Sequence, residues 1–182
     1  MKKAAFFALT VLAAFSFKAV DTQVDTYGMP IDSATGKITY VKVINETGKA
    51  DELYDRAYAW AKKYFVNISS SIRHRDKANG LLSGITRFKV YGADKKGRKI
   101  DAGIISYEFT LNFKENRYRI VETNFRQVNN SGNPVEKWFY DTNEKAKPIH
   151  KKIFAQIDAK AKEMIKSLEA GMKPAPKKSD DW

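Results

Sequence analysis

The sequence contains no cysteine and only two histidines among 182 residues. Without cysteine the chain can form no disulfide, no thiolate metal site and no cysteine nucleophile, and it offers no cysteine for lipid attachment. His74 and His150 are more than seventy positions apart, which leaves little basis for a histidine metal site or an acid–base relay. We therefore expect no metal and no cofactor.

Motifs that bind nucleotides or carry a nucleophile are also missing. The chain has no Walker, Rossmann or nucleophile-elbow pattern. Glu108 and Glu122 interrupt two neighbouring predicted strands, but the favoured register places them on opposite faces of the sheet, so they form no paired-carboxylate site. We therefore predict no catalytic residues and a protein that is not an enzyme, with a hydrolase whose groups converge only in the fold as a third class of function.

Long apolar runs are absent apart from residues 4–15. This run is shorter than the roughly 20 residues that cross a bilayer. Two lysines precede it, and Ala14 and Ser16 supply the small residues that signal peptidase requires. The pattern predicts a signal peptide at residues 1–16 and an exported protein, periplasmic or extracellular, with no transmembrane segment after cleavage.

Positive charge dominates the chain, with a formal net charge of +12. Loss of Lys2 and Lys3 with the signal peptide leaves 12 − 2 = +10. In a cytosolic protein this balance would indicate nucleic acid, but outside the cytoplasm the abundant polyanions are lipid head groups, surface polysaccharide and shed DNA. We therefore expect an anionic surface or an envelope protein as the partner rather than nucleic acid in the cell.

Hydrophobic periodicity predicts one α+β domain at residues 35–170. An extended lead-in at 17–34 precedes it, and a charged, proline-containing tail at 171–182, expected to be disordered, follows it. The predicted strands are Lys37–Ile44, Asn67–Arg75, Leu81–Tyr91, Lys99–Phe113 and Arg117–Gln127. The predicted helices are Ala50–Phe65 and a long helix that begins near Pro148 and ends at Gly171.

Turn chemistry predicts how the last three strands pair. A two-residue turn at Glu115–Asn116 places Phe113 opposite Tyr118. In the preceding hairpin Phe88 is predicted to face Ala102, on even numbers, whereas the apolar series of the second strand continues on odd numbers. We therefore expect a bulge near Ile104–Ile105 to reconcile the two series.

Alternation along the strands predicts a basic face. If the apolar residues face the helices, six cations point to the other side of the sheet: Arg73, Arg75, Arg87, Lys89, Arg117 and Arg119. These residues form a candidate binding face for a polyanion. The alternative is the charged, solvated face that one-sided antiparallel sheets commonly present to water.

Aromatic residues on the inward face allow a second function. They are Tyr107, Phe109, Phe113, Tyr118, Trp60 and Phe154. They could line a cavity between the sheet and the terminal helix, which would make the protein a carrier of an apolar, lipid-like ligand, or they could simply be core.

Several local sequences, together with the order of elements, resemble a known family. They are Pro30-Ile31-Asp32, Thr35-Gly36-Lys37-Ile38, Asp51-Glu52-Leu53-Tyr54, Ala59-Trp60, Arg117-Tyr118-Arg119-Ile120 and Asn124-Phe125. They resemble uncharacterised exported bacterial proteins, common in Bacteroidetes, that are described as a domain of unknown function with a TBP-like fold. The resemblance implies a strand, a helix, a four-strand antiparallel meander and a final helix, with the helices on one face of a curved sheet. It supplies no catalytic residues, so we expect a non-enzymatic binding or interaction module of the bacterial envelope.

Overall fold

A five-stranded sheet and two long helices make up most of the structure, a computed structural model that describes residues 24–94, 96–128 and 132–174. The strands are β1 (Tyr40–Asn45), β2 (Ile72–Asp76), β3 (Leu81–Ala93), β4 (Lys99–Lys114) and β5 (Arg117–Gln127). The helices are α1 (Ala50–Tyr64), α2 (Ile68–Ser71), the 3-10 helix η1 (Val135–Tyr140) and α3 (Lys147–Gly171). The predicted signal peptide at residues 1–16 lies outside the described residues.

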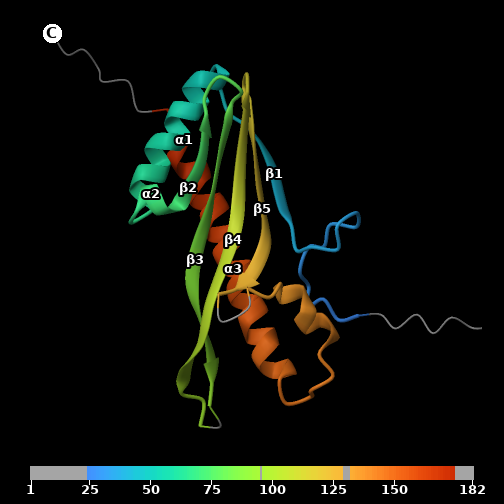
Figure 1. Cartoon of the computed structure of the whole chain (residues 1–182). Coiled ribbons are helices and arrows are strands. Elements are labelled where there is room, and N and C mark those ends of the chain that lie inside the picture. Colours follow the sequence, from blue (N-terminus) through green and yellow to red (C-terminus); the bar gives the residue numbers. More distant parts are fainter. Residues whose placement is uncertain (1–23, 95, 129–131, 175–182) are drawn as a thin grey trace, which may run out of the picture.

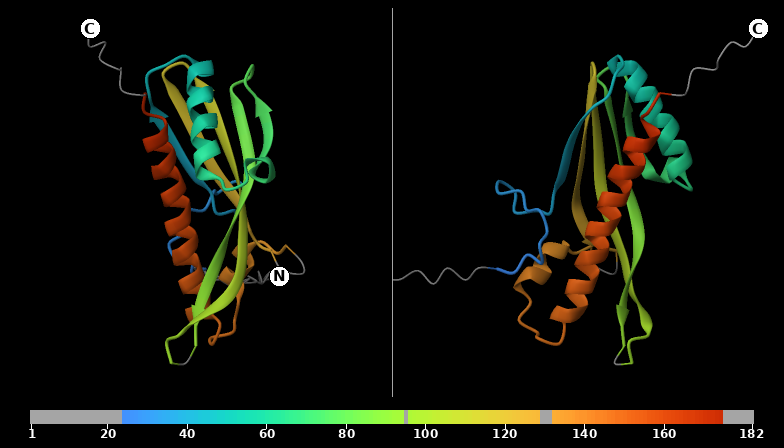
Figure 2. Two further views of the ribbon diagram at one scale, coloured as in Figure 1. Left: turned by 90° about the vertical axis from the view of Figure 1, so that its left-hand side faces the viewer. Right: turned by 180° about the vertical axis from the view of Figure 1, so that it is seen from behind.

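The sheet is antiparallel throughout, in the order β1-β5-β4-β3-β2. β2 to β5 form a meander, and β1 pairs with β5 at the far edge (Figure 1). Phe113 lies opposite Tyr118, as predicted. Helices α1 and α3 cover one face, and the other face is open (Figure 2). The predicted α+β architecture is confirmed.

The bounds of α1 follow from its sequence. Acidic residues occupy the first turn and lysines the last, which suits the helix dipole. The side chain of Glu52 accepts a hydrogen bond of 3.0 Å from the backbone N–H of Lys49 and so caps the first turn. One stripe of side chains is buried against the sheet and α3: Leu53, Tyr54, Ala57, Trp60 and Ala61.

The first two strands differ from the prediction at their starts. Residues 68–71 form the short helix α2 instead of a strand, because the side chain of Asn67 accepts a hydrogen bond of 3.1 Å from the N–H of Ser70 and so caps a helical turn. β1 begins at Tyr40, and Ile38 forms only an isolated bridge with Ile31.

The register of β3 and β4 also differs from the prediction. Phe88 pairs with Ile105 and not with Ala102. The hairpin does contain a bulge in β4, as predicted. Gly103 pairs with Val90 and Asp101 pairs with Tyr91, so Ala102 is the extra residue, two positions from the predicted Ile104–Ile105.

The loop between the two strands explains the shift in register. The N–H of Asp94 donates a hydrogen bond of 2.9 Å to the carbonyl of Arg98, which closes the loop tightly and pairs Ala93 with Lys99. Gly97 supplies the positive φ, 78°, that this tight closure uses. The bulge therefore forms near the loop, where the two apolar series must be brought onto one face.

Helix α3 spans the length of the covered face and holds both ends of the described domain. Tyr27, from the predicted lead-in, stacks on Phe154 of α3 with ring centroids 5.0 Å apart. Met172 is fully buried and its N–H donates to the carbonyl of Leu168, so the predicted tail boundary at residue 171 is wrong by at least this residue. Within the described ranges, no helix is both long and apolar enough to span a membrane.

Candidate functional site

The open face of the sheet carries a cleft of about 350 Å³ near the β4–β5 turn. β1, β4, β5 and the β2–β3 turn contribute its walls. The lining residues are Val43, Asn79, Asn112, Lys114, Arg117, Tyr118 and Arg119. Three of them are cationic, two are amides and none is acidic. We call this site the Arg117–Arg119 cleft.

The register of the strands sets the charge of this cleft. Arg119 lies opposite Asn112, and its Nη2 donates a hydrogen bond of 3.1 Å to the Asn112 Oδ1. Arg117 lies directly opposite Lys114. Two like charges opposite each other on one face repel and destabilise a sheet. Neither Arg117 nor Lys114 forms an ion pair with any described carboxylate, so the positive potential of the cleft is not neutralised by the described residues.

Two other predicted residues lie on the same face but far from the cleft. Arg87 and Lys89 pair with Ser106 and Ile104 on the side of the sheet away from the helices. Arg87 is six residues along β3 from Leu81, which is in the row of Arg119 and Asn112, and this separation corresponds to about 20 Å. The predicted basic face is therefore divided into two separate groups.

The prediction that Arg75 belongs to the basic face is wrong, because its side chain lies on the side of the sheet that the helices cover. The register shifts between Ile72 and His74, so Arg75 pairs with the buried Leu82 and shares its inward face. Its guanidinium lies over the ring of Tyr58 on α1, 5.1 Å from the centroid. A β-bulge moves every later side chain of a strand to the other face, and the sequence pattern of β2 did not reveal one.

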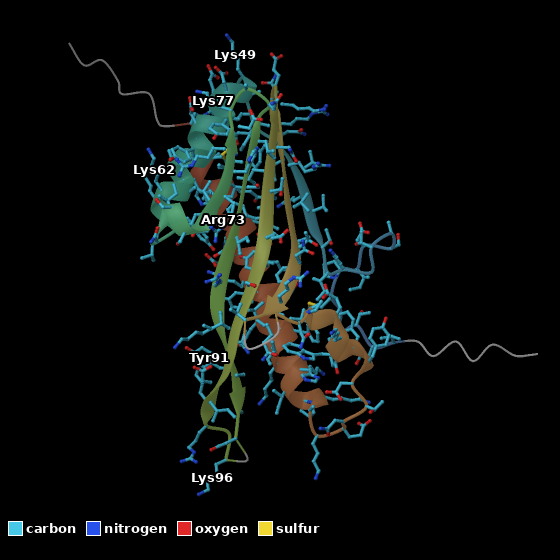
Figure 3. All side chains as sticks on the ribbon, in the orientation of Figure 1. Lys49, Lys62, Arg73, Lys77, Tyr91 and Lys96 are labelled. Atoms are coloured by element: carbon cyan, nitrogen blue, oxygen red, sulfur yellow. The ribbon has the colours of Figure 1, made fainter. Side chains whose placement is uncertain are left out.

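Arg73 lies at this same bulge and lines an edge cleft rather than the Arg117–Arg119 cleft. The edge cleft has a volume of about 590 Å³ and lies beside the part of β3 that β2 does not cover. Arg87 and Lys160 also line it. Figure 3 shows Arg73 on β2, well away from the tip of the β3–β4 hairpin, where Lys96 lies.

Glu122 is a buried carboxyl whose burial was not predicted from the sequence. It pairs with Tyr40 and Phe109 on the inward face and is 0% exposed. Neither of its carboxylate oxygens has a hydrogen-bond partner among the described residues. The sequence did contain a signal for this burial. Glu122 follows Tyr118 and Ile120 at a spacing of two, and alternation along a strand places all three side chains on the core face.

The environment of Glu122 favours the neutral acid. Burial, and to a lesser degree the nearby carboxylate of Glu163, raise its pKa to about 8, and Lys160 opposes this effect. Glu108, the other carboxyl considered in the sequence, is exposed on the open face, where it accepts a hydrogen bond of 2.7 Å from Asn124. The two carboxyls thus lie on opposite faces, as the register predicted, and form no catalytic pair.

The two histidines are also far apart in the fold. His74 is exposed on β2, whereas His150 is buried at the start of α3 and stacks on Trp138 with ring centroids 5.0 Å apart. Burial lowers the pKa of His150 and the nearby Asp141 opposes this effect. No three carboxylate or histidine side chains in the described part of the chain are grouped so that they could hold a metal ion.

The aromatic residues considered for a ligand cavity pack against other aromatic rings of the core. Tyr107 and Phe125 stack with centroids 4.9 Å apart, and Phe65 and Phe109 stack at 5.3 Å. All six rings named in the sequence are at most 5% exposed. These contacts are typical of core, and the apolar carrier stays a prediction without a supporting observation.

Comparison with known proteins identifies the domain. A crystal structure of a DUF4468 family protein from Bacteroides ovatus has a TM-score of 0.62 and 17% identity, covering 85% of this chain and 95% of that one. A TBP-like protein from Parabacteroides distasonis has a TM-score of 0.54 and 17% identity, covering 78% of this chain and 97% of that one. At this identity the likeness concerns the fold alone. No curated protein matches the chain.

The family assignment rests on the sequence of the sheet and α1. The family described as "Domain of unknown function (DUF4468) with TBP-like fold" matches residues 40–127, from the first residue of β1 to the last of β5. Both the predicted family resemblance and the predicted TBP-like fold are thus confirmed. Residues 40–127 of this chain belong to the DUF4468 family of domains with a TBP-like fold.

Proposed function

We propose that this protein is an exported, non-enzymatic binding module of the bacterial envelope, and that it binds an anionic partner through the Arg117–Arg119 cleft. The partner is an anionic polymer or an acidic protein surface. The N-terminal sequence pattern supports export. The observation that carries the binding proposal is the unneutralised pair of Arg117 and Lys114, which lie opposite each other in a cleft without an acidic lining residue.

A bound anion would relieve the repulsion between the cations of the cleft. A like-charge pair across two strands costs stability, and a bound anion would remove that cost and gain charge-assisted hydrogen bonds. The guanidinium groups supply donors in a planar fork that suits sulfate, phosphate and carboxylate oxygens. Asn112, whose Oδ1 accepts from Arg119, has an amide nitrogen that adds a neutral donor, whereas the Nδ2 of Asn79 already donates a hydrogen bond of 2.7 Å to Asp76.

The test measures binding of a soluble sulfated dextran by titration calorimetry, with neutral dextran as the reference. The double variant Arg117→Gln and Arg119→Gln should lose at least tenfold in affinity and lower the slope of log K against log salt by about two. The matched control, Arg87→Gln with Lys89→Gln, removes the same charge from the same face outside the cleft and should change affinity less than threefold.

Three results would count against this proposal. Equal losses in the two double variants would mean that net charge, and not the cleft, governs binding. Affinity that does not change with salt would exclude an electrostatic site. Absence of any binding by the unaltered protein would exclude the anionic polymer as a partner. An acidic protein would then be the remaining candidate, and a pull-down with the unaltered protein and the same two double variants would test it.

A further inference from the structure

The β3–β4 hairpin and the first turns of α3 lie together at the end of the molecule away from α1 (Figure 2). Gly92, near the tip of β3, brings them into contact. A Cβ atom at Gly92 would lie 3.4 Å from the side chain of Ile100 on β4 and 3.9 Å from that of Ile149 on α3. The two isoleucines therefore flank one small area of backbone, and Gln156 of α3 joins the same area through its hydrogen bonds to Tyr91.

Both isoleucines are exposed, although they are large and apolar. Ile100 is 44% exposed and Ile149 is 39% exposed. Single exposed apolar residues are common on soluble proteins, but here two lie side by side on a protruding end.

Cations lie on both faces of the hairpin near this apolar pair. Lys96, Arg98 and Lys99 come from the hairpin, and Lys152 is three residues after Ile149, on the same side of α3. Arg98 bonds to Asp94 at 2.7 Å, whereas Lys96, Lys99 and Lys152 form no ion pair within the described residues. Lys99 lies on the face of the hairpin opposite Ile100, with its Nζ 3.6 Å from the centroid of the Tyr91 ring. Figure 3 shows Lys96 at the outermost point of the hairpin, beyond Tyr91. We call Lys96, Arg98, Lys99, Ile100, Ile149 and Lys152 the hairpin end.

We propose that the hairpin end is a docking surface for an anionic lipid bilayer. Exposed aliphatic side chains at an end that also carries several lysines match the two layers of such a surface, because the isoleucines enter the boundary between head groups and acyl chains while the lysines meet the anionic head groups. The lysines can extend along the membrane and keep their charge in water. The surface protrudes, so it can meet a planar bilayer without a matching concave partner.

The orientation that follows is compatible with the Arg117–Arg119 cleft but does not depend on it. The hairpin end adjoins the first residues of β4, and the cleft adjoins its last residues. β4 runs from Lys99 to Lys114, which corresponds to about 50 Å of strand. Docking by the hairpin end would hold the cleft away from the bilayer, where it remains free for its own partner.

The first test is cosedimentation with vesicles that contain phosphatidylglycerol, with pure phosphatidylcholine vesicles as the reference. The protein is used in the form that its host exports, with its N-terminal residue determined, because residues 4–15 are themselves apolar. We expect binding to the anionic vesicles only. The double variant Lys96→Glu and Lys99→Glu should weaken binding by roughly 30-fold or more, since each cation near an anionic surface contributes about fivefold.

The matched control is Lys63→Glu with Lys166→Glu. Both lysines are exposed and form no ion pair with a described residue, and the double variant makes the same change in net charge. Binding by this control should fall less than threefold. An equal loss in both double variants would show that net charge alone drives binding and would overturn the proposal, as would failure of the unaltered protein to bind anionic vesicles.

The second test separates insertion from simple attraction of charges. The double variant Ile100→Ser with Ile149→Ser should weaken vesicle binding by about tenfold, and salt should abolish the binding that remains. The control variant Val66→Ser, at another exposed apolar residue, should bind vesicles as the unaltered protein does. Unchanged binding in the isoleucine variant would refute docking by this surface. Melting temperatures of all variants confirm that each is folded.

A third arm distinguishes the two proposals. The variant Arg117→Gln with Arg119→Gln should bind vesicles as the unaltered protein does. Loss of vesicle binding in this variant would assign the lipid to the cleft and refute the hairpin end. Loss of sulfated dextran binding with vesicle binding intact would support both proposals independently.

Discussion

Replacing Glu122 with glutamine should remove a large pH dependence of stability. The pKa of Glu122 is raised in the folded protein, so the folded state keeps a proton that the unfolded state releases. Because the unfolded state then binds fewer protons, the free energy of unfolding falls as the pH rises between the two pKa values. Below the lower pKa and above the higher one, this contribution is constant.

The size of the effect follows from the burial of Glu122. The pKa rises from 4.5 in the unfolded chain to about 8 in the fold, and each pKa unit corresponds to about 1.4 kcal/mol. The free energy of unfolding should therefore fall by about 5 kcal/mol across this window. That is a large share of the roughly 5–15 kcal/mol typical of a domain.

The groups around Glu122 determine how far its pKa is raised. Tyr40 and Phe109 flank it in the sheet, and Tyr107 lies close enough for the carboxyl to raise the tyrosine pKa. On α3 the lysine and the glutamate that face it, Lys160 and Glu163, pair with each other. The cation that could have neutralised Glu122 is thus already engaged, and burial decides the outcome.

The assay is urea unfolding, followed by tryptophan fluorescence, from about pH 5 to about pH 9. Near pH 5 the protein and Glu122→Gln should be almost equally stable, because both carry a neutral, unpartnered group. Near pH 9 the variant should be the more stable by about 5 kcal/mol. The buried His150, whose pKa is lowered, stabilises the folded state as the pH rises through its titration, but it is common to both proteins and cancels in the difference.

The control is Glu108→Gln, which removes an exposed carboxylate from the opposite face of the sheet. It should not reproduce the change. A difference in unfolding free energy between the unaltered protein and Glu122→Gln that stays constant across the pH range would refute the reasoning. It would mean that water or a shift of α3 solvates the carboxylate in the folded state.

Two further substitutions test the packing of α3. Gly171→Ala should destabilise the fold by about 1–2 kcal/mol, because the new Cβ would lie 2.6 Å from Cδ1 of Trp60; a double-mutant cycle with Trp60→Leu should recover most of the loss, and simple additivity would contradict the clash. Gln156→Leu removes the two bonds, 3.0 and 2.8 Å, that its amide makes with the backbone N–H and carbonyl of Tyr91. Hydrogen exchange of the Tyr91 amide should then accelerate, and unchanged protection would show that the edge of β3 needs no such partner.

Local patterns in the sequence predicted the elements wherever the periodicity was long and regular. β5 has the bounds that were predicted for it, and α1 ends within one residue of its predicted end. α3 was predicted from its apolar stripe and the proline in its first turn. In these segments the buried face and the intrinsic preference of the residues agree, so no tertiary contact overrides them.

The bulge in β2 was the main feature that local patterns could not place. The bulge in β4 lies within two residues of its predicted position, whereas the bulge in β2, at Arg73, follows the helical turn at Asn67 that delays the strand. Each extra residue reverses the faces of the side chains beyond it. For this reason Arg75 was assigned to the wrong face although the alternation argument was sound for the uninterrupted part of the meander.

The position of the cations carries more functional meaning than their number. A composition with +12 predicts a basic surface, but several lysines are neutralised in the fold, such as Lys162 by Asp158 at 2.8 Å and Lys77 by Asp55 at 2.7 Å. Exposed pairs of this kind contribute little to stability and leave no net field. At Arg117 and Lys114 two like charges lie opposite each other on adjacent strands, and no described carboxylate pairs with either. This local excess of positive charge, rather than the net charge of the chain, is what supports the proposed anion site.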